Sequence, residues 1–439
     1  MSVTATRKGG PPAAAEKTAK QRYLAVDGLR GVCALALLFT HVAMIQGLLG
    51  TKELGGTIGP SNAVGGFFAG GLQIFAGVFF VLTGMFVYQP FAKSIITGAQ
   101  RKRGGTVIRR VLRLLPAYYA MYVVVLVALN LQQVDNLWDV LRPALLLHIY
   151  DWDGWINGME ITWTVPDMAQ FYLLLPVLAW ATYKFAGRGK TARARAYRMM
   201  IPVPVLFAAG IAWLLYSQMN NLGTRALFWW PMGLMPEIAI GMIIAIWLEL
   251  HKASPQEAPK LLTFAGRHRV LFLFVALACL ITNCARPGSE IGMDDFYSLG
   301  ALGIFYGLLA ILSASLMLSM VAPGPDSRLI RAVFTNRVIL FIGKISYGVY
   351  LWQFAVMHFY LQKPDAYFGG TPMPLIMIRG NTGFWELELV TLAGTIVLST
   401  ISYYLLERPL MNWGERVIKR RAARKAAALP RPREESVPV

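Results

Sequence analysis

Ten apolar stretches alternate with short polar connections along the chain. Each stretch is about as long as the roughly 20 residues that a helix needs to cross a bilayer. The pattern therefore predicts an all-α fold, a polytopic membrane helix bundle with about ten transmembrane helices. The predicted spans are residues 24–47, 67–91, 114–131, 164–184, 201–218, 233–250, 270–285, 299–321, 345–362 and 384–406.

Basic residues are distributed unevenly between these spans. Of the 42 lysines and arginines, 35 lie in alternate segments that include both ends of the chain, and six lie in the segments between them. Because membrane proteins concentrate Lys and Arg in cytosolic loops, we expect an N-in, C-in orientation in the inner (plasma) membrane. The topology explains the formal charge of +19, so nucleic acid is not an expected partner.

The composition fits a membrane protein. Hydrophobic residues make up 56% of the chain, above the roughly 45–50% that is usual for soluble domains. The three cysteines suggest neither a disulfide framework nor metal-ligand spacing, so no metal is predicted. We expect a disordered basic cytosolic tail at 1–22, a membrane domain at 23–413, and a basic amphipathic or disordered tail at 414–439 that meets anionic lipid.

Three ionisable residues lie within or at the edge of the first predicted span: Asp27, Arg30 and His41. Such groups usually face a bundle interior or a water-filled cavity. Eleven helical steps place Arg30 and His41 within roughly 20° of one face, about 16 Å apart along the axis. Asp27 is one turn before Arg30 and can pair with it. We expect a functional site here; alternatively, Asp27 and Arg30 anchor the helix and His41 is a satisfied polar residue between helices.

Three arginines, Arg109, Arg110 and Arg113, directly precede the third predicted span. Guanidinium groups bind phosphate oxygens bidentately, so these residues are candidates for an anion site at the cytosolic edge. The alternative is that they contact lipid headgroups.

The longest connection on the outer face, 132–163, is rich in carboxylates and aromatic rings. Its aromatic residues are Trp138, Tyr150, Trp152, Trp155 and Trp163. Carboxylates and aromatic rings suit carbohydrate, so the segment is either a lid or sugar platform, or a belt at the membrane interface. Asp167 and Gln170 then enter the fourth predicted span, with Pro166 in its first turn.

Five motifs in chain order resemble the acyltransferase-3 family of integral membrane acyltransferases, and the resemblance covers residues 23–413. The motifs are Asp27-Gly28-Leu29-Arg30-Gly31 followed by His41, FFVLTGMFVY (Phe79 to Tyr88), RRVLRLLPAYY (Arg109 to Tyr119), ISYGVYLWQ (Ile345 to Gln353) and LLERP (Leu405 to Pro409). The resemblance implies a bacterial enzyme that O-acylates envelope glycans, glycolipids or related acceptors. A trehalose glycolipid is one candidate acceptor.

Two positions depart from the family pattern. The fourth motif of the family resembles WSLSVEEQFYL, with one or two glutamates, whereas this chain has WTVPDMAQFYL. Asp167 stands one residue early, about 100° around the helix, and is the candidate for the missing acid. Gln353 stands where the family often has histidine. His41 is therefore the best candidate base.

The resemblance implies acetyl-CoA or another acyl-CoA as the donor. Its phosphates would meet the three arginines, with Tyr118 and Tyr347 beside the donor, and Trp163, Gln170, Tyr172 and Gln353 would face the acceptor. His41 would act as general base, Arg30 would bind phosphate or developing negative charge, and Asp27 would hold Arg30. An acyl-histidine intermediate is the alternative to direct transfer.

A second hypothesis is a transporter or flippase that moves a lipid-linked sugar without covalent chemistry. Charged residues inside spans fit this class equally well. The chain shows no internal repeat, however, which many transporter folds have. Release of CoA from an acyl-CoA would favour the enzyme.

Overall fold

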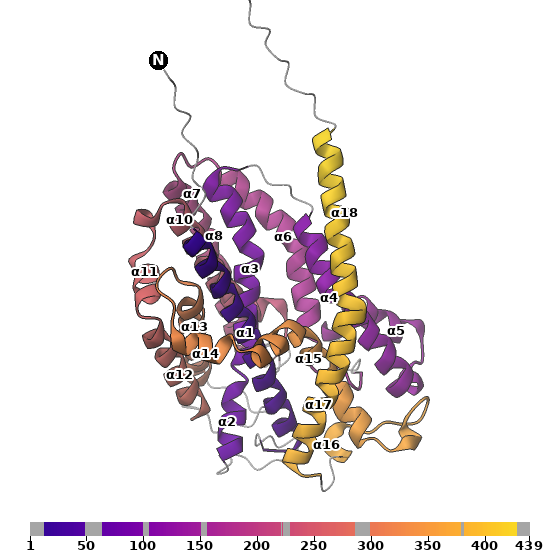
Figure 1. Cartoon of the computed structure of the whole chain (residues 1–439). Coiled ribbons are helices and arrows are strands. Elements are labelled where there is room, and N and C mark those ends of the chain that lie inside the picture. Colours follow the sequence, from indigo (N-terminus) through magenta and orange to yellow (C-terminus); the bar gives the residue numbers. More distant parts are fainter. Residues whose placement is uncertain are drawn as a thin grey trace, which may run out of the picture.

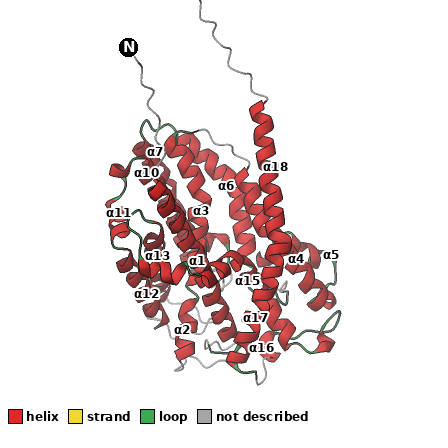
Figure 2. Cartoon of the chain, viewed as in Figure 1, coloured by secondary structure: helices red, strands yellow, loops and turns green. Residues whose placement is uncertain are grey.

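The protein is described from a computed structural model, which covers residues 13–48, 64–99, 105–150, 156–220, 222, 229–285, 299–378 and 382–427. These residues form helices and connecting turns and contain no strand (Figure 2). The predicted all-α fold is therefore confirmed.

Long helices form the bundle and short ones connect them. The long helices are α1 (Ala13–Ile45), α3 (Phe75–Thr97), α4 (Gly105–Leu129), α6 (Thr164–Ala186), α8 (Pro202–Met219), α10 (Met235–Ala253), α12 (Arg269–Cys284), α13 (Leu299–Val321), α15 (Arg337–Leu361), α17 (Phe384–Ser402) and α18 (Arg408–Ala427). The short helices are α2 (Val64–Leu72), α5 (Leu137–Ala144), α7 (Ala192–Met200), α11 (Lys260–Arg267), α14 (Arg328–Phe334) and α16 (Leu375–Ile378).

Eight helices within the described residues are long and apolar enough to cross a membrane, and the pair α11–α12, bent by 94°, makes a ninth. The fourth predicted span, 164–184, falls on α6, a helix of 23 residues that is not among them. Polar residues such as Asp167, Gln170 and Lys184 lower its hydropathy. The structure thus confirms a polytopic helical membrane protein and places a helix at each predicted span.

The first and last helices reach the same end of the bundle. The start of α1 and the end of α18 both lie toward the top of Figure 1, whereas α2 and α16 lie at the opposite end. An even number of crossings requires this arrangement. We call the first end inner and the second outer, following the predicted topology.

Glycine allows α1 and α15 to pack at very short range. A Cβ on Gly31 would lie 2.6 Å from the carbonyl oxygen of Ile339, and one on Gly343 would lie 2.0 Å from that of Asp27. Because any side chain would force the backbones apart, these positions require glycine. The close approach brings the polar face of α15 against the charged face of α1.

The C-terminal helix continues directly from α17. A π-helical segment, Tyr403–Glu407, joins α17 to α18, and Phe384–Arg421 forms one long helical run. The predicted tail 414–439 therefore begins inside a helix, and residues 428–439 lie outside the described part. At the other end, α1 begins at Ala13, within the predicted tail 1–22.

Candidate functional site

A cavity of about 530 Å³ lies between α1, α3, α4, α6, α15 and α18. It is lined by polar groups from α1 and α15, arginines from α4, and aromatic and aliphatic side chains from α3 and α6. Of the predicted site residues, nine line it: Asp27, Arg30, His41, Arg109, Arg110, Arg113, Trp163, Tyr172 and Tyr347. Helices far apart in the sequence thus bring most of the predicted site together.

Arg30 is fixed by one partner on its own helix and one on α15. Its Nη1 lies 3.6 Å from Asp27 Oδ1, in an ion pair one helical turn apart. Its Nη2 donates a hydrogen bond of 3.0 Å to Ser346 Oγ. The Arg30 side chain is 15% exposed and that of Asp27 50% exposed, so Asp27 bridges the buried guanidinium to a wetter region. The guanidinium is therefore held on the cavity wall by one hydrogen bond and one ion pair.

His41 is held in one tautomer by Gln353. The Gln353 amide nitrogen donates to the carbonyl oxygen of Tyr350 at 3.1 Å, which turns the amide oxygen toward His41. That oxygen lies 3.0 Å from His41 Nδ1 and can only accept, so Nδ1 carries the proton. The ring nitrogen Nε2 consequently holds a lone pair. It has no hydrogen-bond partner within the described residues, which suits a proton acceptor.

The arginines at the inner end of the cavity differ in their partners. Arg110 Nη2 donates to the carbonyl oxygen of Phe86 at 2.9 Å, and the guanidinium lies 6.0 Å from the ring centroid of Tyr172. Arg109 pairs with Glu415 of α18. Arg113 is in electrostatic reach of Glu407 and makes no hydrogen bond within the described residues. Arg113 is thus the arginine most available to an anion.

Stacked aromatic rings form the wall at the other end. Trp163 stacks on Phe80 at a centroid distance of 6.0 Å and on Trp229 at 6.1 Å. Trp163 and Phe80 line the cavity together with Ile161. Of the aromatic residues predicted to form a lid or sugar platform, Trp163 lines the cavity, whereas Trp152 and Trp155 lie outside the described residues.

Four predicted site residues do not line the cavity: Gln353, which bonds His41, and the three that follow. Tyr118 is buried and its hydroxyl donates to the carbonyl oxygen of Pro143 at 2.7 Å, so it braces α5 from behind. Gln170 accepts a hydrogen bond of 2.7 Å from the hydroxyl of Tyr150. Asp167 is only 3% exposed, and its carboxylate oxygens have no hydrogen-bond partner within the described residues. The one-residue shift from the family pattern turns it away from the cavity.

Among the cavity residues that sequence reasoning did not single out as site residues are Ser346, Tyr350, Met411 and Glu415. Tyr350 carries a visible signal, because it continues the three-residue repeat of Tyr347 and Gln353. Ser346 and Glu415 act through Arg30 and Arg109, more than 300 positions away in the chain, so no local pattern could reveal them. No group of three or more metal-ligating side chains occurs within the described residues.

Sequence comparisons give the cavity a chemical context. A family model described as an acyltransferase domain matches residues 23–406. The chain is 24% identical to a protein of Staphylococcus aureus (strain MRSA252) named as a putative O-acetyltransferase, over 93% of this chain and 60% of that protein. It is 24% identical to YrhL of Bacillus subtilis (strain 168), named as a putative peptidoglycan O-acetyltransferase, over 92% of this chain and 57% of that protein.

A third relative is nodulation protein 10 of Rhizobium leguminosarum bv. viciae, 23% identical over 78% of this chain and 83% of that protein. The chain spans about 60% of the length of the staphylococcal relatives. No solved structure matches the chain significantly. The family match covers the helices that build the cavity, and the chain therefore belongs to the acyltransferase-3 family of membrane acyltransferases.

Proposed function

We propose that this acyltransferase moves an acetyl or other acyl group from acyl-CoA to a hydroxyl of an envelope glycolipid or glycan. The observation that carries the proposal is His41, whose Nδ1 is hydrogen-bonded to Gln353 and which lines the same cavity as the arginines of α4. A base in a fixed tautomer and an anion site at one end of a cavity are what acyl transfer from CoA requires.

His41 would act directly on the acceptor. Its Nε2 takes the proton of the acceptor hydroxyl as that oxygen attacks the thioester carbonyl carbon. The C–O bond forms, the C–S bond breaks, and the imidazolium returns the proton to the departing CoA sulfur. Gln353 keeps Nδ1 protonated throughout, so the same ring can serve as base and then as acid. The alternative, attack by Nε2 itself to give an acyl-histidine, uses the same lone pair.

Arg30 would bind an anionic group of the donor, since Arg30 and His41 are about 16 Å apart along the axis of α1 and cannot both contact the thioester. Ser346 and Asp27 already fix its guanidinium, so little reorganisation is needed when the anion binds. Asp27 would balance the local charge before the donor binds. In this proposal Arg30 and Asp27 have roles that the sequence predicts for them.

The donor would enter from the cytosolic end. Arg113 is the first candidate for its phosphates, and Arg110 and Arg109 lie beside it on the same helix. The hydroxyl of Tyr347 donates to the carbonyl oxygen of Leu114 at 2.6 Å, which leaves its ring as cavity wall. Met411 and Gly414 of α18 complete this end. The pantetheine arm would run from here toward His41.

The acceptor would enter from the other end, beside Trp163. The stack of Phe80, Trp163 and Trp229 offers a flat apolar face of the kind that packs against a sugar ring. A peptidoglycan-type glycan is suggested by the name of the Bacillus relative, and a trehalose glycolipid remains the other candidate. In either case we place the enzyme in the plasma membrane, with the acceptor side outward.

Purified protein in detergent provides the first test. The protein is incubated with acetyl-CoA and with membrane vesicles from a strain that lacks the gene. Free CoA and acylated lipid or glycan are then measured. The proposal expects CoA release that depends on His41, together with a new acyl mass on a vesicle component. Movement of a lipid-linked sugar without CoA release would instead support a flippase.

A further inference from the structure

The loop 156–163, which leads into α6, forms part of the cavity wall although it has no regular secondary structure. Residues 156–163 follow one another in turns, and Ile161 and Trp163 at the end of the loop line the cavity. Gly158 has φ +89° and fits tightly against Val125 and Ala355, so the loop is wedged between α4 and α15. The tight packing of this loop therefore sets the position of Trp163.

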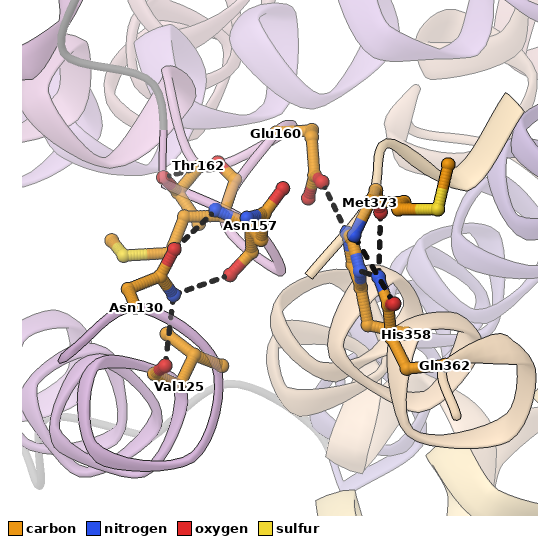
Figure 3. A network of polar contacts seen from close by, with 9 residues as sticks. Val125, Asn130, Asn157, Glu160, Thr162, His358, Gln362 and Met373 are labelled. Atoms are coloured by element: carbon orange, nitrogen blue, oxygen red, sulfur yellow. Dashed lines mark hydrogen bonds and ion pairs between the residues drawn. The ribbon is translucent and has the colours of Figure 1, made fainter. Parts of the chain in front are cut away.

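One side of the loop is tied to α4 by Asn130 (Figure 3). The Asn130 amide nitrogen donates to the carbonyl oxygens of Val125, at 2.8 Å, and Asn157, at 3.0 Å. Its amide oxygen accepts from the backbone N–H of Asn157 at 2.9 Å. One side chain thus satisfies both backbone groups of Asn157, as a neighbouring strand would.

The other side is tied to α15 by a hydrogen bond between His358 and Glu160. Glu160 Oε1 lies 2.6 Å from His358 Nε2, and His358 is fully buried. The Glu160 side chain is 16% exposed. Figure 3 shows the two side chains pointing toward each other from the loop and from α15. A contact this short between a carboxylate and an imidazole N–H is a strong, directional bond.

Gln362 determines which ring nitrogen of His358 carries the proton. The Gln362 amide donates to the carbonyl oxygen of Met373 at 2.5 Å and accepts from the Met373 N–H at 3.2 Å. This orientation points an N–H of the same amide at His358 Nδ1, 3.1 Å away. Nδ1 must then accept, so the proton of the neutral ring is on Nε2 and faces Glu160. The backbone of Met373 thus fixes the Gln362 amide, and through this amide the His358 N–H is placed toward Glu160 of the loop.

We propose that Glu160 and His358 are positioning residues for acyl transfer, which with Asn130 hold the loop 156–163 as a fixed wall on the acceptor side of the cavity. The consequence for catalysis rests on the proposed function. The contact between Glu160 and His358, which we call the clamp, does not depend on that function. Neither residue lines the cavity, so both act through Ile161 and Trp163. Loss of the clamp should release this wall and leave the donor end intact.

The test measures hydrogen exchange and transfer on the full-length protein. Glu160→Ala should speed exchange in peptides covering 156–163 by about tenfold or more, because a local clamp is lost, with α1 unchanged. In the vesicle assay the same variant should need several-fold more vesicle acceptor for half-maximal transfer, at an unchanged KM for acetyl-CoA. Glu386→Ala is the matched control. Glu386 of α17 accepts a hydrogen bond from Tyr360 near the end of α15, the helix that carries His358, and does not bond the loop.

Two conservative variants separate positioning from other roles. Glu160→Gln and His358→Gln each keep one hydrogen bond across the clamp, so both should stay within about threefold of wild type in exchange and in transfer. Unchanged exchange in Glu160→Ala would overturn the clamp. Loss of transfer in Glu160→Gln with an unchanged loop would make Glu160 a group that acts on the acceptor itself. A wild-type protein that transfers nothing would refute the proposed function, while the exchange result still decides the clamp.

Discussion

The two ends of the cavity are held by different kinds of contact. At the inner end, Arg109 and Glu415 form an ion pair in which both side chains are about half exposed, and Arg113 has no hydrogen bond within the described residues. At the centre and outer end, His41 and Gln353 pair through a neutral hydrogen bond. The loop beyond them is clamped on both sides by buried groups.

This difference matches two different tasks. Half-exposed ion pairs contribute little to stability, about 0–1 kcal/mol, so an incoming phosphate can replace Glu415 beside Arg109 at small cost. Proton transfer instead needs a base whose lone pair has a fixed direction, and the partly buried neutral hydrogen bond between His41 and Gln353 fixes it. We therefore expect changes at the inner end to alter donor binding and changes at the centre to alter turnover.

The largest effect is expected for His41→Ala. Loss of a general base typically lowers turnover by about 10²–10⁴-fold, and the cavity should otherwise persist because His41 is only partly buried. The measurement is CoA release and acyl incorporation by purified protein of wild-type thermal stability. His268→Ala removes an exposed histidine remote from the cavity and serves as control. A stable His41→Ala enzyme with wild-type turnover would make His41 structural.

Gln353→Leu tests the tautomer and should have the next largest effect. Without the amide oxygen, Nδ1 loses its acceptor and the two neutral tautomers of His41 become closer in energy. We expect turnover to fall about 10–100-fold, by analogy with groups that orient a catalytic or ligating histidine. The KM for acetyl-CoA should not change. Gln353→Glu, which restores an acceptor to Nδ1, should recover part of the loss; if both variants behave alike, Gln353 serves packing alone.

Arg113→Gln should weaken donor binding and spare chemistry. Phosphate contacts far from the thioester stabilise ground and transition states equally, so we expect a raised KM for acetyl-CoA at nearly constant kcat. One lost charge-assisted contact, about 1.5–3 kcal/mol, corresponds to roughly tenfold or more in KM. Lys252→Gln, at an inner-end pair with Glu249 outside the cavity, is the control. An unchanged KM would assign Arg113 to lipid contacts.

The sequence predicted the helices and part of the site for identifiable reasons. Hydropathy gives each span its length, and the eleven-residue spacing of Arg30 and His41 places both on the cavity wall. The partners of these residues come from α15, whose close approach to α1 depends on Gly31 and Gly343, and no local sequence period encodes that approach. For the same reason the clamp between Glu160 and His358, 198 residues apart, could not be foreseen.

Motif matching was least informative about Asp167. The sequence placed this residue near the acid of the family's fourth motif, but a helical residue shifted by one position points about 100° away. In the structure Asp167 lies in the first turn of α6 and does not line the cavity. The motif therefore predicted that Asp167 lies in a helix. The direction of its side chain depended on its exact position along that helix.

The smallest effect is therefore expected for Asp167→Asn. A carboxylate that is 3% exposed and lacks a hydrogen-bond partner in the described chain gains nothing from its charge, so the neutral amide should be tolerated. A favourable interaction with the start of α6 is worth only about 0.3–1 kcal/mol. We expect transfer within about threefold of wild type, which is less than 1.4 kcal/mol of barrier, and an unshifted pH profile. A loss of tenfold or more, with the thermal stability retained, would instead return Asp167 to the role of the family acid, acting on the acceptor hydroxyl or on a cationic His41 from behind the aromatic wall.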